Sequence, residues 1–311
     1  VGLECVLPDG SKFVTPDAPR SAAGPDFKQI MIGAEGTLGI VTAAKLRIHR
    51  YPEHREFLSF EFPDWNVATE SVREIMQRGL TPAVVRLYDE ADTQLNASHM
   101  KIQVKGILGV FVCEGEQRLT AFEAKKLAEI CEGLGGNALG EGPARRWWEH
   151  RYDVSYNMSK VLPNKGMVLD TIELAATWSA LPALYEKVRA ALASEAMIVL
   201  CHLSHAYITG ASLYFSIVAR SESEDKVLEK YDAIWSKAMD AAHACGSTIS
   251  HHHGVGELKA KWMNAEHGAL QDLYAGLRAQ LDPQGLLNPG KMGLAKHSKK
   301  SAPRGARGGA S

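Results

Sequence analysis

Residues 30–48, IMIGAEGTLGIVTAAKLRI, place three glycines within seven positions and follow them with a run of strand-forming residues. Glycines let backbone N–H groups approach a ligand closely, so the stretch is compatible with a cradle for a phosphate or a cofactor. It is not a G-x-G-x-x-G motif after a strand, and it lacks the lysine and Ser/Thr of a P-loop. From the residues alone a tight structural turn is favoured, and a cofactor role stays open.

The rest of the composition is that of a globular protein. The chain has 311 residues, of which 45% are apolar and 23% are charged, and this suffices for one large or two medium domains. The net charge of −1 provides no polybasic field, so we expect no nucleic-acid partner. No apolar run approaches the roughly 20 residues that a membrane span needs.

Five cysteines are scattered along the sequence without a C-x-x-C pair. An odd number in mixed surroundings is typical of reduced thiols in a reducing compartment. The sequence also lacks a signal-peptide pattern. These features predict a cytoplasmic location; a peroxisomal one in a eukaryote is expected only from the family resemblance described below.

Both ends of the sequence depart from ordinary domain composition. VGLECVLPDGSKFVTP (1–16) has the pattern of two short strands around a Pro-Asp-Gly turn. The sequence thus opens in mid-sheet, and we expect the front of its first domain to be missing. Residues 295–311 are basic and rich in Gly, Ser and Ala, which predicts a disordered tail.

An alternation of strands and helices fills the region between these ends. Strand patterns at 57–62, 83–89 and 107–113 accompany one helix capped by Asp64 and another over 117–136. The order strand–helix–strand–strand–helix then recurs over 166–246, with a hairpin around Thr209-Gly210. This order predicts an α+β fold with one largely antiparallel sheet and helices packed on one side.

The glycine-rich stretch resembles the segment that closes the FAD-binding domain of the vanillyl-alcohol-oxidase-type flavoproteins, where a G-[SA]-E-G-T-L-G-[IV]-[IV]-T run touches the flavin. LDPQGLLNPGKM (281–292) resembles the C-terminal signature of the same family. The family's pyrophosphate-binding loop has no counterpart in this sequence, which would be roughly the back half of a longer flavoprotein. The resemblance implies FAD as cofactor, in contact with Glu35, Gly36, Thr37, Leu38, Gly39, Ile40 and Val41.

The same resemblance divides the sequence into parts. Residues 1–52 would be the C-terminal part of the FAD-binding domain. Residues 53–280 would form a cap domain, which holds the substrate, of the FAD-linked oxidase C-terminal type. Residues 281–294 would return to the FAD-binding domain.

Within this fold the chain is similar to the alkyldihydroxyacetonephosphate synthases. The related flavin-dependent 2-hydroxyacid dehydrogenases hold a metal through H-x-G-D-G-N-x-H and G-E-H-G-[IV]-G motifs, where this sequence has CHLSHAY (201–207) and HHHGVG (251–256). Three consecutive histidines before Gly-Val-Gly are a synthase feature. So are an arginine at the position of Arg86 in VVRLYD and a tyrosine at the position of Tyr214 in GASLYFS.

The resemblance implies roles that the residues alone do not fix. By itself Tyr214 is a half-buried packing tyrosine, whereas the matching tyrosine of the synthases is catalytic. The ordinary pKa of a phenol is about 10, so nearby histidines would have to lower the pKa of Tyr214, or the phenol would have to act as a proton relay. Arg86 fits either a rim ion pair or an anion clamp.

The three histidines allow more than one interpretation. In an extended chain His251, His252 and His253 would point alternately, so two at most would face one cavity. A metal site and a solvated loop stay open, and a cluster that binds phosphate and shuttles protons is favoured. Two further substrate contacts of the synthases fall, less clearly, at Lys160, for which Arg151 is the alternative, and at His202.

The resemblance therefore implies an FAD-dependent enzyme that exchanges the acyl group of acyl-dihydroxyacetone phosphate for a fatty alcohol in ether-lipid formation. Tyr214, aided by the histidines, would remove a C1 proton, while Arg86 and the histidines hold the phosphate or the leaving carboxylate. No metal is expected for this reaction. The alternative is an FAD-linked oxidoreductase acting on a small hydroxyacid, with His202, His205 and the triple histidine binding a metal. Peripheral membrane association and a homodimer stay open.

Overall fold

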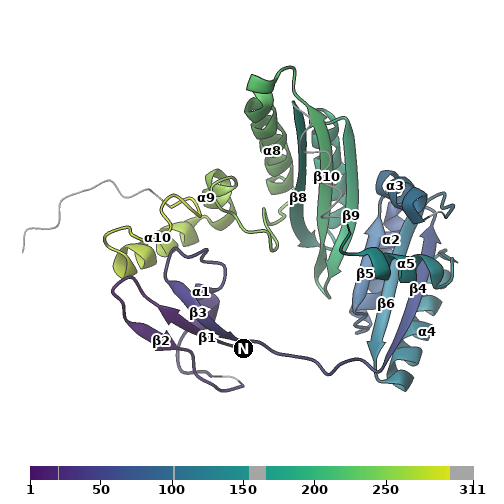
Figure 1. Cartoon of the computed structure of the whole chain (residues 1–311), viewed down its shortest axis with the longest axis horizontal. Coiled ribbons are helices and arrows are strands. Elements are labelled where there is room, and N and C mark those ends of the chain that lie inside the picture. The colour runs from purple at the N-terminus through teal and green to yellow at the C-terminus, as the bar shows by residue number, and fades with distance from the viewer. Residues whose placement is uncertain (20, 101, 154–165, 295–311) are drawn as a thin grey trace, which may run out of the picture. The chain divides into compact units, whose positions relative to one another are not determined.

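The computed structural model describes residues 1–19, 21–100, 102–153 and 166–294. Its contacts divide the chain into two compact units (Figure 1). We call residues 1–48 with those from Gly254 onward the terminal unit, and His49–His253 the sheet unit. The expected tail over 295–311 and the candidate Lys160 lie outside the described residues.

The terminal unit is built on a small antiparallel sheet with strand order β2-β1-β3. Its core contains Cys5, Met31, Ala34 and Leu38, against which Tyr274, Leu277 and Leu281 of the last helix pack. Its elements are β1 (Gly2–Val6), β2 (Lys12–Val14), α1 (Phe27–Met31), β3 (Ile40–Lys45), the 3-10 helix η2 (Ala260–Trp262), α9 (Met263–His267) and α10 (Ala269–Leu281).

The contacts therefore divide the chain after Ile48 and after His253, where the sequence analysis expected boundaries after 52 and 280. The second difference has a simple cause. The apolar face of α10 is visible in the sequence, but the pattern does not tell which core that face covers. In the structure it covers Leu38 and its neighbours in the terminal unit.

The sheet unit contains a seven-stranded sheet with strand order β7-β4-β6-β5-β9-β10-β8. Every neighbouring pair in it is antiparallel. Its strands are β4 (His54–Phe62), β5 (Val84–Tyr88), β6 (Ile107–Gly115), β7 (Asn137–Ala138), β8 (Met167–Thr177), β9 (Ile198–Ala206) and β10 (Gly210–Arg220). Its helices are α2 (Trp65–Gln77), α3 (Glu90–Met100), α4 (Gln117–Gly133), α5 (Gly142–His150), α7 (Leu181–Ala193), the 3-10 helix η1 (Glu224–Lys226) and α8 (Val227–His243).

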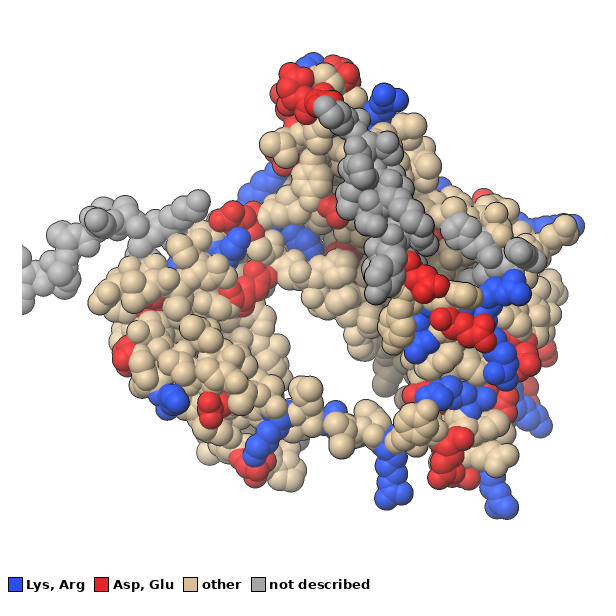
Figure 2. Space-filling view, viewed as in Figure 1, with Lys and Arg blue, Asp and Glu red and all other residues tan. Residues whose placement is uncertain are grey.

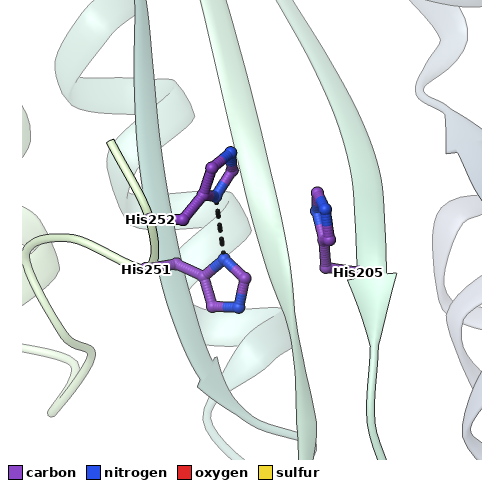
Figure 3. A group of neighbouring side chains, drawn as sticks. All are labelled: His205, His251 and His252. Carbon is purple, nitrogen blue, oxygen red and sulfur yellow. Dashed lines mark hydrogen bonds between the residues drawn. The ribbon is translucent and has the colours of Figure 1, made fainter. Parts of the chain in front are cut away.

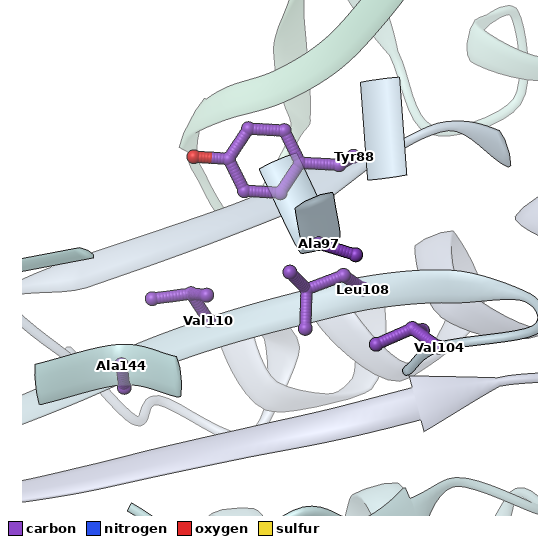
Figure 4. Packing of buried hydrophobic residues seen from close by; sticks show 6 residues of the cluster. All are labelled: Tyr88, Ala97, Val104, Leu108, Val110 and Ala144. Atoms are coloured by element: carbon purple, nitrogen blue, oxygen red, sulfur yellow. The ribbon is translucent and has the colours of Figure 1, made fainter. Parts of the chain in front are cut away.

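Helices lie on both faces of this sheet. Helices α2, α4, α7 and α8 pack on one face, where Trp65 of α2 stacks on Tyr185 of α7 with ring centroids 4.6 Å apart. Helices α3 and α5 cover part of the other face and bring Ala97 and Ala144 onto Leu108 and neighbouring residues of the sheet (Figure 4). The predicted fold class is confirmed, and so is the predicted element order of the second half. In the first half α3 stands between β5 and β6, so the predicted pair of consecutive strands is wrong there, and so is the expectation of helices on one side only.

Opposite charges are interspersed over the part of the surface that Figure 2 shows. Several of them form ion pairs in the sheet unit, such as Arg55 with Glu114 at 2.7 Å and Arg145 with Glu141 at 2.9 Å. Exposed pairs of this kind contribute little to stability. None of the helices in the described ranges is both long enough and apolar enough to cross a bilayer.

Candidate functional site

A row of polar side chains crosses four strands of the sheet unit. The antiparallel register sets Glu173 of β8 opposite Tyr214 of β10, Tyr214 opposite His202 of β9, and His202 opposite Tyr88 of β5. Residues directly opposite one another in antiparallel strands project from the same face. The rings of His202 and Tyr214 accordingly stack, with centroids 4.8 Å apart and planes 13° from parallel.

A β-bulge adds His205 to this row. His202 and His205 are three positions apart, so in a regular strand they would point to opposite faces. The β9–β10 register shifts between Ala211 and Ser212, and His205 adopts a left-handed backbone with φ of 50°. The extra residue of a bulge breaks the strict alternation of side chains along the strand, so His205 can project from the same face as His202. His205 Nδ1 lies 2.9 Å from the Tyr214 hydroxyl.

The loop after α8 brings the other imidazoles to the same place. Thr248 pairs with Ala175 at the edge of β8, and this directs residues 250–253, which we call the histidine loop, over the sheet. His252 ring nitrogens lie 3.2 and 3.3 Å from the Tyr214 hydroxyl. His251 Nδ1 lies 3.0 Å from His252 Nδ1, and the Tyr207 hydroxyl lies 2.7 Å from His251 Nε2. Figure 3 shows the rings of His205, from β9, and of His251 and His252, from the loop, converging.

Tyr214 is a buried phenol, with 8% of its surface exposed. Burial is the largest influence on it and raises its pKa to about 12, with the Glu173 carboxylate acting in the same direction. The suggestion that neighbouring histidines lower this pKa is therefore wrong. Partial burial also lowers the pKa of His205, assisted by His252 and His251, and this favours the uncharged ring. A neutral phenol bonded to a neutral imidazole is arranged for proton relay.

His202 is occupied by two protein partners. Its Nε2 lies 3.0 Å from Arg86 Nη2, and its Nδ1 lies 3.3 Å from Asp92 Oδ2. Because a guanidinium can only donate, Nε2 must accept, and the proton of a neutral ring then resides on Nδ1 and faces the carboxylate. Both ring nitrogens of His202 have protein partners, so the structure does not favour the direct substrate contact expected from the sequence, and that contact stays a prediction. His202 supports Arg86, whose guanidinium also lies 5.1 Å from the centre of the Tyr88 ring.

The titration of His202 provides a test of this arrangement. Burial, and then the charge of Arg86, lower the pKa of His202 to about 4. This lies below the ordinary histidine pKa of about 6.5, so the folded state binds fewer protons than the unfolded state between these values. We expect about 3 kcal/mol of stability to be lost as the pH falls from about 6.5 to 4, and none below that from this residue. NMR of the labelled His202 ring should show a titration midpoint near pH 4. A midpoint near 6.5 would contradict the burial of His202 beside Arg86.

Glu173 belongs to the site although the sequence analysis did not select it. Its side chain is fully buried, and it accepts a 2.6 Å hydrogen bond from the backbone N–H of His252. The available signal was one of two carboxylates inside the strand pattern GMVLDTIELA, the one that lies directly across from the catalytic candidate Tyr214. Only the register between β8 and β10 shows that Glu173 lies opposite Tyr214, and the sequence does not reveal that register.

The glycine-rich run 33–42 is tied into the terminal unit. Glu35 accepts hydrogen bonds from the backbone N–H groups of Val255 (2.5 Å) and Gly256 (2.8 Å). Thr37 and Leu38 are fully buried, and the Thr37 hydroxyl bonds the Ala34 carbonyl at 2.7 Å. A Cβ on Gly39 would come within 2.9 Å of Met31 Cε and 3.0 Å of the Val6 carbonyl oxygen. The side chains of Glu35, Thr37 and Leu38 thus have structural partners, and Gly39 is required by packing.

One group of imidazoles has the spacing of a metal site. The ring nitrogens of His205, His251 and His252 lie within 4.8 Å of one another. His202 is not a member, because Arg86 and Asp92 hold its nitrogens. His253 packs beside this group, with its ring centroid 5.7 Å from that of Tyr214. The catalytic role of each of these residues stays a prediction.

Comparison with known proteins places this geometry in a family context. The family model described as FAD linked oxidases, C-terminal domain, matches residues 51–292. An uncharacterized FAD-linked oxidoreductase of Escherichia coli is 28% identical over 312 residues, which cover 93% of this chain and 62% of the relative. The alkyldihydroxyacetonephosphate synthase of Dictyostelium discoideum is also 28% identical, over 94% of this chain and 52% of its own length.

A solved structure of an alkyldihydroxyacetonephosphate synthase shares the fold. It aligns with a TM-score of 0.68 at 24% identity, over 93% of this chain and 52% of that chain. At this identity the likeness concerns the fold alone. The chain spans between about half and three fifths of the length of the relatives it matches.

Proposed function

This chain belongs to the FAD-linked oxidase family, C-terminal domain, and on that premise we propose that it forms the substrate-handling part of an alkylglycerone-phosphate synthase-like enzyme. The proposed reaction exchanges the acyl group of acyl-dihydroxyacetone phosphate for a long-chain alcohol in ether-lipid synthesis. The observation that supports it best is the contact of the Tyr214 hydroxyl with His205 and His252, with the half-buried Arg86 held by the neighbouring His202. The cytoplasmic location, membrane contact and homodimer considered above remain predictions.

The terminal unit fits part of a flavin site. Gly36 is exposed in a left-handed conformation, and among the described residues a Cβ there would meet only Asn288 Nδ2, at 3.8 Å. Ile40 and Val41 are 55% and 47% exposed, so their apolar surfaces are open to a ring system. We propose that this open backbone and these two side chains hold FAD. Bound FAD would supply the electron sink that allows substitution at a carbon next to a carbonyl group.

Tyr214 would move the proton in this reaction. Its Oη would take a C1 proton from the substrate as its own proton passes to His205 Nδ1 or to His252. The C1–O bond to the fatty acid then breaks, and the fatty acid leaves as a carboxylate. The alcohol oxygen bonds to C1 and loses its proton, and the proton removed from C1 is restored at the end. No net oxidation occurs.

Arg86 would hold the negative charge of the substrate. Its Nε is buried and has no hydrogen-bond partner among the described residues, while Nη2 is held by His202. An always-charged group with an unused donor suits a phosphate or a leaving carboxylate. Asp92 stabilises the arrangement through His202, so the arginine is oriented before substrate arrives.

The proposal is tested with full-length, FAD-loaded protein, acyl-dihydroxyacetone phosphate and labelled hexadecanol. We expect the label in an ether-linked product, with one fatty acid released per product and no loss of flavin absorbance near 450 nm. Release of fatty acid without incorporation of the alcohol would mean ester hydrolysis, and would rule out the exchange reaction.

The three clustered imidazoles favour a second candidate function. Their nitrogens could bind a divalent metal that acts as a Lewis acid on a small hydroxyacid, in an FAD-linked oxidoreductase. Two measurements separate the candidates. A stoichiometric metal in the purified protein, together with flavin bleaching by 2-hydroxyacids, would support the oxidoreductase and count against the synthase.

A further inference from the structure

Glu173 is the one fully buried carboxylate of the described residues that faces the histidine loop. The backbone N–H groups of His252 and His253 donate to its two oxygens at 2.6 and 3.4 Å, and the Ser250 hydroxyl donates at 3.4 Å. Ring nitrogens lie equally near, with His252 Nδ1 at 3.1 Å and His251 Nδ1 at 3.4 Å from Oε1. These partners all come from four consecutive residues, whereas Glu173 itself belongs to the rigid sheet.

Such a carboxylate is costly to bury unless polar groups surround it. Here the loop supplies those groups, so the charge and the loop conformation depend on each other. If the carboxylate were neutral, the loop would lose charge-assisted hydrogen bonds, which are roughly twice as strong as neutral ones. The contacts of Glu173 thus fix the place of His252 relative to Tyr214, its cross-strand neighbour.

The carboxylate also selects the tautomer of His252. An ionised glutamate only accepts hydrogen bonds, and the two Nδ1 atoms beside it lie 3.0 Å apart, so only one of them can carry a proton. The nearer one is His252 Nδ1, at 3.1 Å against 3.4 Å for His251 Nδ1, and we assign the proton to it. His252 Nε2, 3.2 Å from the Tyr214 hydroxyl, is then left as an acceptor. This is the arrangement in which a carboxylate orients an imidazole that in turn takes a proton from a hydroxyl.

We propose that Glu173 is the positioning residue of the site, which anchors the histidine loop and holds His252 ready to accept the proton of Tyr214. The assignment rests on the proposed role of Tyr214 in proton transfer. It adds a residue from a further strand, β8, and it makes a statement about ring titration that holds whatever the substrate is.

The charged and titratable neighbours of the histidine loop come from four elements. Glu173 lies on β8, His205 on β9 and Tyr214 on β10, and Tyr207 reaches His251 from the turn between β9 and β10. Burial lowers the pKa of His251, and the Glu173 charge opposes that effect. Removing this charge should therefore move the His251 titration to lower pH.

The test compares Glu173→Gln with Asp170→Asn in the full-length, FAD-loaded protein. Glutamine keeps the size and the acceptor oxygen and removes the charge. Asp170 is a matched control because it is a carboxylate of the same strand, but its partners are Tyr231 and Trp235 of α8 and the backbone N–H of Thr171. We expect the His251 midpoint, followed by NMR of labelled histidine, to move to lower pH in Glu173→Gln and to stay in place in Asp170→Asn.

Turnover is the second readout. We expect kcat of Glu173→Gln to fall by about tenfold or more with little change in KM, since orienting groups contribute one to several decades in rate. Asp170→Asn should retain kcat. An unmoved His251 midpoint would overturn the assignment even if the enzyme proved to be a synthase. A moved midpoint in a protein without synthase activity would refute the proposed reaction and leave the placement of Glu173 intact.

A further variant covers the case in which Glu173→Gln does not fold. Glu173→Asp keeps the charge and shortens its reach by one methylene. We expect this variant to fold and to keep the His251 midpoint nearer to wild type than the glutamine variant would. Its kcat should be reduced, because the bond to the loop is lengthened. Full kcat in Glu173→Asp would show that the position of the carboxylate does not matter and would also overturn the proposal.

Discussion

Replacing Tyr214 with phenylalanine should reduce kcat by about 10²- to 10⁴-fold, the range typical of a lost general acid or base. The ring would still fill its place between His202 and the histidine loop, so folding should be nearly unaffected. Only the hydroxyl that contacts His205 and His252 disappears. KM should change little, because Arg86 is left in place.

The measurement needs a control that removes a buried phenol elsewhere. Tyr185 lies on the opposite face, where its hydroxyl bonds the fully buried Asp89 at 3.2 Å. Tyr185→Phe should cost about 1 kcal/mol of stability, the usual net value of one hydrogen bond, and leave kcat unchanged. If both variants lost activity equally, the effect of Tyr214 would be structural. If Tyr214→Phe kept full activity, proton transfer by the phenol would be excluded.

The second large effect is expected at Arg86. Changing it to methionine keeps an unbranched apolar stem and removes the charge. We expect KM to rise about 10- to 100-fold, as follows from losing ~1.5–3 kcal/mol of charge-assisted hydrogen bonding to an anionic substrate. Steady-state kinetics with acyl-dihydroxyacetone phosphate measure this change.

Arg55 provides the comparison for Arg86. It also lies on the sheet, but away from the polar row. It pairs with Glu114, and its guanidinium carbon lies 5.0 Å from the centre of the Trp148 ring. Arg55→Met should leave KM within a factor of two or so of wild type, since pairs this exposed contribute only about 0–1 kcal/mol. A normal KM for Arg86→Met would remove the anion-binding role. The same variant should raise the pKa of His202, because the Arg86 charge is one cause of its lowering.

The architecture of the sheet unit follows closely from the sequence. Alternating patterns such as FLSFEF correspond to strands, and Asp64 caps α2 as expected, with its carboxylate accepting from the Val67 N–H at 2.9 Å. These signals are local, which is why they can be read from residues a few positions apart. The position of α5 on the second face is not local, because its apolar side chains fit either face of a two-sided sheet.

The site was only partly predictable for the same reason. Family resemblance indicated Tyr214, the three histidines and Arg86, and the structure brings Tyr214 together with His252 and, through His202, near Arg86. His205 joins them through a bulge, and no sequence pattern marks an extra residue in a strand. Glu173 becomes meaningful only when the register is known. The use of Glu35 as an acceptor for the loop after His253 likewise depends on a contact between residues distant in sequence.

The central claim is that the Tyr214 hydroxyl removes a proton from C1 of the substrate, and solvent exchange tests it most directly. The full-length, FAD-loaded enzyme is run in deuterium oxide with acyl-dihydroxyacetone phosphate and hexadecanol, and C1 of the ether product is analysed by mass spectrometry and NMR. We predict one solvent deuterium at C1 for the wild-type protein, and neither exchange nor product for Tyr214→Phe at comparable times. Ether product that retains both original C1 hydrogens would contradict the account.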